Sequence, residues 1–263
     1  ILQAYYDVDY ADRFEDFFGG LDIGRDPTGE QGQYLFIDFN FTGVEKRFDR
    51  VQDSFDEYCC LRLDKFARDH AADLPPGVSD QILSARHCHG KLNALSMLLK
   101  GSGLRLYITI DEYDNFTNTI LAESRESYEA LCHGDGFFKQ FFNELKLATT
   151  GTDAPVTRLF ITGVTPVTMD DVTSGFNIAA NISMDPAFAA FTGFTHADIR
   201  DMLAYYRAHA GFAFDEGAVF ETMRLWYDNY RFAPGTGPDG TEPPRVANPT
   251  LVLYYMQYFL RNH

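Results

Sequence analysis

Two carboxylates stand directly after an apolar segment of this sequence. Residues 104–110 read LRLYITI and are followed at once by Asp111 and Glu112. Such a run predicts a buried strand, and open parallel sheets bind ligands beyond the carboxyl ends of their strands. An aspartate at that place can hold Mg²⁺, which prefers carboxylate oxygen, and a glutamate can take a proton from an attacking water. The spacing therefore predicts Asp111 as a metal and cofactor ligand and Glu112 as a catalytic base.

A second apolar segment ends in a different polar residue. Residues 156–162 read VTRLFIT, so the segment closes on Thr162. An apolar strand ending in Asp-Glu is the Walker B arrangement of P-loop ATPases. In those with an additional strand, the strand beside it ends in a polar residue that senses the γ-phosphate, which makes Thr162 a candidate catalytic residue. A plainer explanation stays open for both segments, because acids and threonines often end strands as the solvated start of a loop.

The sequence does not contain the loop that would cradle the phosphates. A P-loop needs G-x-x-x-x-G-K-[ST], because backbone N–H groups and the lysine must hold the phosphate oxygens. The only Gly-Lys pair, Gly90-Lys91, has Ala85 in place of the first glycine, is followed by Leu92, and lies within a predicted helix. We therefore expect this chain alone to be inactive as an ATPase.

Other chemistry is less well indicated. His87 and His89 flank Cys88, but residues two apart on a helix point to different faces, so we do not expect them to share a metal. A metal-dependent nuclease could use Asp111, Glu112 and Asp114. The PD-(D/E)xK pattern, however, needs a lysine at the place where Asp114 stands.

Composition excludes several classes of protein. The chain has 263 residues and a formal net charge of −16, which argues against a protein that coats nucleic acid. It has neither a signal peptide nor an apolar run long enough for a membrane span. The four cysteines match no zinc or thioredoxin pattern, and the N-x-[ST] sequons, including the one at Asn40, read as chance matches. These features predict a cytoplasmic protein with reduced cysteines.

Hydrophobic periodicity predicts where the elements lie. Strands are expected over 34–41, 104–110 and 156–162, and helices over 48–73, 79–100 with Ser79 as N-cap, 136–148, 196–209, 214–228 and 249–261. The stretch between 115 and 135 is expected to be a loop. Alternating strands and helices predict an α/β fold with a parallel sheet. We expect this α/β core over residues 1–182 and a mostly helical lid or C-terminal subdomain over 183–263.

Taken in order, the motifs resemble the AAA-ATPase-like domain family, whose members are often joined to a PD-(D/E)xK nuclease-like domain. ITIDEYDNF is similar to the family's "DEYD" Walker B signature, and YLFIDFNF to its second core strand. The remaining matching segments are ILQAYYD…RFEDFFGGLDIG, LFITGVTPVTMDDVTSGFNIAANIS, FTGFTHADIRDML and LWYDNYRF…VANPTLVLYYM. One departure is NIAANIS, where the family usually has a double asparagine.

The resemblance implies a P-loop NTPase-like three-layer αβα core that uses ATP and Mg²⁺. It gives Asp111 the Mg²⁺ role, Glu112 the water-activating role and Thr162 the sensor role. Asp114 completes the signature as a further cofactor-site residue that can fix the adjoining loop. The family's first strand and Walker A loop should precede Ile1, and their loss should leave a gap in the sheet. The chain is thus expected to be part of an ATPase domain that hydrolyses Mg-ATP in the complete protein.

Partners are less constrained. The alternative to an ATPase is a non-catalytic interaction or regulatory module that keeps the fold without nucleotide. The resemblance implies a fused nuclease-like domain in the full-length protein as one partner. It leaves oligomers open, since AAA relatives form rings in which an arginine finger reaches a neighbour's site. Arg158 and Arg200 are nominal candidates, and Arg231 lies in a family motif whose simplest role is to cap Trp226 and Tyr230 in a core.

Overall fold

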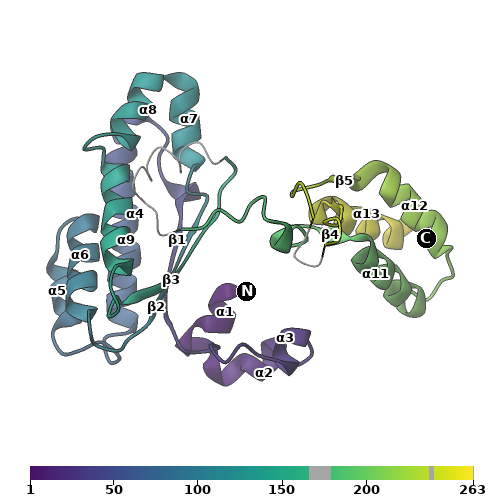
Figure 1. Cartoon of the computed structure of the whole chain (residues 1–263), viewed down its shortest axis with the longest axis horizontal. Helices are drawn as coiled ribbons and strands as arrows, with labels where there is room; N and C mark the ends of the chain where they lie inside the picture. The colour runs from purple at the N-terminus through teal and green to yellow at the C-terminus, as the bar shows by residue number, and fades with distance from the viewer. Residues whose placement is uncertain (166–178, 237–239, 263) are drawn as a thin grey trace. The chain divides into compact units, whose positions relative to one another are not determined.

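A computed structural model of the chain describes residues 1–165, 179–236 and 240–262 (Figure 1). Its contacts divide the chain into two compact units, Ile1–Ala179 and Ala180–His263. The first unit contains a parallel sheet with long helices, and the second is mostly helical with a small sheet of very short strands.

Three parallel strands form the sheet of the first unit. They are β1 (Leu35–Asn40), β2 (Leu106–Asp111) and β3 (Val156–Ile161), in the spatial order β1-β2-β3. The register pairs Asn40 with Asp111 and Ile110 with Ile161, so the three strands end at one edge. Helical crossovers connect them, as parallel neighbours require. The predicted α/β class with a parallel sheet is confirmed.

Long helices cover one face of this sheet (Figure 1). The crossovers contain η2 (Phe41–Gly43), α4 (Phe48–Asp69), α5 (Val78–Ser84), α6 (Cys88–Leu99), α7 (Asn115–Glu123), α8 (Arg125–Cys132) and α9 (Phe137–Thr149). Alternate strand residues such as Ile37 and Ile108 share the main core with buried residues of these helices, among them Leu63, Leu95 and Leu145. No helix within the described residues is both long and apolar enough to cross a membrane.

The N-terminal segment lies against the other face. It consists of α1 (Leu2–Tyr6), η1 (Val8–Arg13), α2 (Phe14–Phe18) and α3 (Asp22–Arg25). Phe36 and Tyr107, strand side chains that lie outside the main core, pack there with Leu2 and Tyr6 and with Tyr34, which precedes β1. The sheet thus has helical layers on both faces, consistent with the predicted P-loop NTPase-like three-layer core.

The helix expected over residues 79–100 is in fact two helices, α5 and α6. Ala85, which ends α5, is extended at ψ 136°. Ser79 is also not the N-cap of α5. Gly77 holds that position at φ 81°, a left-handed conformation that glycine adopts without strain, and the Ser79 hydroxyl donates a hydrogen bond to the carbonyl of Ala67 at 2.7 Å. The serine therefore ties α5 to α4 instead of capping its own helix.

The prediction of a loop between residues 115 and 135 is wrong. This stretch folds into α7 and α8, which are separated only by Ser124. Ser124 caps α8 by accepting a hydrogen bond from the backbone N–H of Ser127 at 3.2 Å. Polar residues interrupt the apolar spacing here, and burial of Phe116, Ile120 and Tyr128 against the core selects helix nonetheless.

The three strands form an uninterrupted sheet, so no gap lies beside residues 104–110. β2 is the central strand and hydrogen-bonds to a neighbour on each side. β3 pairs on one side only within the described residues, and Thr157 and Arg158 near its start are exposed. β1 likewise pairs on one side only among these residues, so any further strand would add at the outer edge of β1 or of β3, not between the strands present.

The second unit has the predicted helices and a small sheet that was not predicted. Its elements are η3 (Pro186–Phe188), β4 (Phe194–Thr195), α11 (His196–His209), α12 (Glu216–Tyr227), β5 (Asp228–Tyr230), β6 (Val246–Ala247) and α13 (Pro249–Asn262). The antiparallel strands lie in the order β4-β6-β5. Thr195 and Asp198 form a reciprocal capping box at the start of α11. Strands of two or three residues are too short to show an alternation of apolar and polar residues. The sequence therefore did not indicate them.

Candidate functional site

Asp111 stands where the ends of the three strands meet. Asn40, its register partner at the end of β1, donates from Nδ2 to Oδ2 of Asp111 at 3.2 Å. The hydroxyl of Thr162, one residue past β3, donates to Oδ1. The backbone N–H of Glu112 reaches the same oxygen at 3.0 Å. Asp111 is nevertheless exposed, so neighbouring strands hold a carboxylate in place while it faces solvent.

Glu112 has an unusual backbone. At φ 54° it is the one non-glycine residue with a positive φ among the described residues. This conformation costs a non-glycine residue roughly 1–2 kcal/mol, and strain of this kind is concentrated at functional sites. The half-buried Glu112 carboxylate accepts a hydrogen bond from Nδ2 of Asn115 at 3.3 Å. The strained turn therefore keeps this carboxylate next to the end of β2.

Asp114 is fully buried and holds the loop that follows β3. Its carboxylate accepts hydrogen bonds from the backbone N–H of Val164 at 3.0 Å and of Thr165 at 2.7 Å. The Thr165 hydroxyl donates to it at 3.0 Å, and Nδ2 of Asn118 at 2.7 Å. The Asp114 side chain thus fixes residues 164–165, and with them the position of Thr162 relative to Asp111.

The electrostatics of Asp114 favour its charged form. Burial by itself raises the pKa of this carboxyl, but the hydrogen bonds from Val164, Thr165 and Asn118 outweigh it, and the net pKa of Asp114 is lowered. The folded protein therefore holds an ionised carboxylate that is surrounded by donors.

Gly163 lies between Thr162 and the anchored loop, where space is short. A Cβ at this position would lie 2.5 Å from Oδ1 of Asp114 and would overlap the ring of Tyr113. We expect Gly163→Ala to lower the free energy of unfolding by about 1–3 kcal/mol, the usual cost of overpacking, as measured by urea denaturation. Gly43→Ala is the matched control, because a Cβ at Gly43 meets nothing within 4 Å. Equal effects of the two substitutions would contradict this assignment.

The candidate arginines have partners within their own units. Arg158 on β3 forms an ion pair with Glu30 at 2.9 Å, and the guanidinium of Arg200 lies 3.8 Å from the ring centre of Phe220. Arg231 lies 3.6 Å from Glu242. Its expected role as a cap over buried aromatic residues is wrong, because Trp226 is 74 % exposed and Tyr230 is 45 % exposed.

The histidines and the lysine singled out earlier lie away from the strand ends. His87 precedes α6, and its Nδ1 contacts Asp56 at 2.9 Å. The ring of His89 is nearly parallel to the ring of His87, with 6.4 Å between the two ring centres. Lys91 is buried within α6, where its Nζ lies 2.6 Å from Asp64 and donates to the carbonyl of Ile82 at 2.9 Å. This lysine holds helices together, which agrees with the conclusion that Gly90-Lys91 is not a P-loop.

Sequence reasoning missed two residues of this arrangement. Asn40 was considered only as part of a sequon. It ends an apolar run in the same way as Thr162 does, and this pattern could have indicated it as a polar residue at a strand end. Asn118 gave no signal, because its contact with Asp114 depends on the turn between β2 and α7.

The Ser174-Gly175 part of the segment after β3 lies outside the described residues.

Comparison with protein-family models identifies the family of this chain. The AAA-ATPase-like family, described as "Predicted AAA-ATPase", matches residues 1–173. The match covers more than half of the chain and includes all three strands of the parallel sheet. The chain therefore belongs to the AAA-ATPase-like family. Searches among curated proteins and among solved structures found no match.

Proposed function

We propose that the strand ends of this domain bind and hydrolyse Mg-ATP once a phosphate-binding loop is present beside them. The observation that carries the proposal is the hydrogen-bonded line of Asn40, Asp111 and Thr162 across three neighbouring strand ends, with Glu112 next to it. Polar side chains fixed at the carboxyl edge of a parallel sheet suit nucleotide binding. The family's description as a predicted AAA-ATPase supports the same class of ligand.

The residues present fit a magnesium nucleotide. Asp111 offers an exposed carboxylate and Thr162 a hydroxyl, both oxygen donors of the kind that Mg²⁺ accepts. Bound there, Mg²⁺ would neutralise charge on the phosphate oxygens. We assign Asp111 to the hydrated metal, Thr162 to the γ-phosphate and Glu112 to the proton of the attacking water. Asp114 contributes by holding the loop after β3.

The free edge of β3 is compatible with completion of the site. A phosphate-binding strand and loop that added there would place backbone N–H groups next to Thr162, across the sheet from Asn40. Residues 1–263 contain no G-x-x-x-x-G-K-[ST]. We therefore assign the phosphate-binding loop to sequence upstream of Ile1.

Nucleotide titration tests the proposal. Mg-ATP is titrated into this chain and into the same chain extended upstream through the predicted loop, with circular dichroism to establish that both are folded. We expect saturable binding only by the extended protein, and weaker binding after Asp111→Asn. A folded extended protein that binds no Mg-ATP would overturn the proposal and favour the alternative, a non-catalytic interaction module. The absence of a P-loop from the sequence is the observation that favours this alternative.

A further inference from the structure

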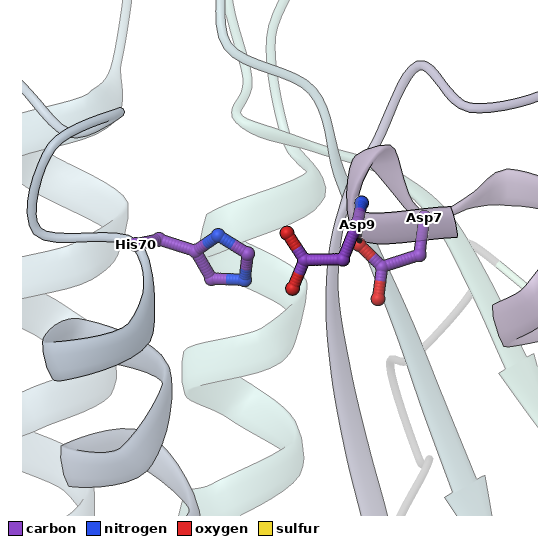
Figure 2. Close-up of side chains that lie close together, drawn as sticks. All are labelled: Asp7, Asp9 and His70. Atoms are coloured by element: carbon purple, nitrogen blue, oxygen red, sulfur yellow. Dashed lines mark hydrogen bonds between the residues drawn. The ribbon is translucent and has the colours of Figure 1, made fainter. Parts of the chain in front are cut away.

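Three potential metal ligands gather at the end of the sheet away from the proposed nucleotide site. Asp7 joins Tyr34 in a bridge just before β1, Asp9 belongs to η1, and His70 ends α4. One ligand atom from each of the three side chains lies within 4.8 Å of the others (Figure 2). The cluster therefore joins the N-terminal segment to the end of the longest helix.

Two of these side chains are inside the protein. Asp7 is 2 % exposed and His70 is 4 % exposed, whereas Asp9 is exposed to solvent. A buried carboxylate and a buried imidazole thus lie close to a second carboxylate that is exposed to solvent. An ion could enter from the side of Asp9.

A third carboxylate contacts the other ring nitrogen of His70. Nδ1 of His70 lies 3.3 Å from Oδ2 of Asp73, and an ionised carboxylate can only accept a hydrogen bond. Nδ1 therefore carries the hydrogen in the neutral ring, and Nε2 keeps its lone pair. Nε2 has no hydrogen-bond partner among the described residues, and Figure 2 shows the imidazole facing the carboxylates of Asp9 and Asp7.

The carboxylates of Asp7 and Asp9 supply further acceptor oxygens near the lone pair on Nε2 of His70. The oxygens of Asp7 accept from Nε2 of Gln3 at 3.1 Å and from the backbone N–H of Asp9 at 3.2 Å, which leaves lone pairs on both. The Asp9 carboxylate accepts no hydrogen bond from the described part of the chain. Burial raises the pKa of Asp7, although its hydrogen bond from Gln3 works against this. Three acceptors thus lie close together, with hydrogen-bond donors only to Asp7, and a buried negative charge there is costly unless a cation compensates it.

We propose that Asp7, Asp9 and His70 bind a divalent transition-metal ion, with Zn²⁺ as the first ion to try. Imidazole nitrogen and carboxylate oxygen are both ordinary zinc ligands. Ligand atoms about 2.0–2.2 Å from zinc lie about 3–4 Å from one another, so small side-chain rotations close the observed spacing. The Asp73 contact is the kind of support that metal-bound histidines have, a carboxylate on the far ring nitrogen.

The bound ion would cross-link two parts of the first unit. It would connect η1 to the end of α4 near the amino end of the sheet, opposite the strand ends that hold Asp111. Its role is therefore structural, and this proposal does not depend on the nucleotide site.

The test compares two charge-matched variants of the full chain. Each protein is freed of metal with a chelator and titrated with ZnCl₂ by calorimetry, and its Tm is measured with and without Zn²⁺. We expect one Zn²⁺ per wild-type chain and a higher Tm when it is bound. Asp9→Asn should weaken binding about tenfold or more, judged from the loss that even a supporting residue causes. Asp12→Asn, an equally exposed acid of the same 3₁₀ helix, should leave binding unchanged.

Cobalt substitution identifies the ligands directly. Co²⁺ bound by nitrogen and oxygen should show visible d–d absorption without thiolate charge-transfer bands, which would appear if any of the four cysteines were ligands instead. The proposal is overturned if no stoichiometric site exists, if Asp9→Asn and Asp12→Asn bind alike, or if thiolate bands appear. It is also overturned if Zn²⁺ leaves the Tm of the metal-free chain unchanged.

Discussion

Glu112→Gln is expected to lower the rate of ATP hydrolysis by about 10²–10⁴-fold, the usual contribution of a positioned general base, in the protein extended to include a phosphate-binding loop. Glutamine keeps the size of the side chain and can still meet the amide of Asn115, but it cannot take a proton from water. Mg-ATP binding should therefore persist while kcat falls. Steady-state phosphate release, with nucleotide titration in parallel, measures the two quantities separately.

The control for this substitution is Glu123→Gln at the exposed end of α7. It makes the same change of charge at the far end of α7 from Glu112 and should leave kcat unaltered. If Glu112→Gln retained the wild-type rate, Glu112 would not be the base, even if the domain hydrolyses ATP. If both variants lost activity together, the change of net charge would be the cause.

Asp114→Ala is expected to lower the free energy of unfolding by about 3–5 kcal/mol, as the loss of one partner from a buried charged network does. The substitution removes a carboxylate that four donors share and leaves the backbone N–H groups of Val164 and Thr165 without an acceptor. A buried N–H group left unpaired costs about 1–3 kcal/mol, which applies more to half-buried Thr165 than to Val164, which is 77 % exposed. Urea denaturation of the chain monitored by circular dichroism gives the value.

Asn118→Ala provides a graded control, because it removes one of the four hydrogen bonds to Asp114 and the one that Oδ1 of Asn118 accepts from the Thr165 hydroxyl, and it should cost about 1–2 kcal/mol. Asp12→Ala, an exposed acid with no such contacts, should cost little. If Asp114→Ala were no more destabilising than Asn118→Ala, the carboxylate would not hold the loop after β3.

The contribution of Asp114 should also depend on pH in a predictable direction. Its pKa in the folded protein is lowered, whereas the unfolded chain should have a value of about 3.9. The stabilisation is therefore fully present above the unfolded pKa and is lost as the pH falls through the lower, folded value. The difference in stability between wild type and Asp114→Ala should stay constant near neutral pH and shrink below about pH 4. A difference that grew on acidification would contradict this assignment.

Much of the first unit could be predicted because its elements have strong local signals. Three apolar runs of about seven residues, separated by long helical stretches, leave little choice other than a parallel sheet. The same argument placed Asp111, Glu112 and Thr162 at one edge, since parallel strands all end on the same side. The sequence failed where contacts decide local structure, as at Ser79, whose hydroxyl bonds to a carbonyl of the preceding helix.

The role of Asp114 shows the limit within the site itself. Its position in a "DEYD" string predicts a place near Asp111 and Glu112. Sequence cannot say that the backbone turns at Glu112 with φ 54° and that Asp114 then lies fully buried against residues 164–165. A side chain that is two residues beyond a strained residue can point to solvent or to the core, and only packing selects between them.

The sequence by itself determined the class of fold, the family and the line of polar residues at the strand ends, because hydrophobic period and motif order are local properties of the chain. Only the tertiary structure decided that β2 is central with β1 and β3 at the edges of the sheet, and that Asn40 completes the hydrogen-bonded line. It also brought Asp7 and Asp9 to His70, more than sixty residues away. Strand order and clusters of this kind depend on how distant segments pack, and such long-range pairing leaves no periodic trace in the residues themselves.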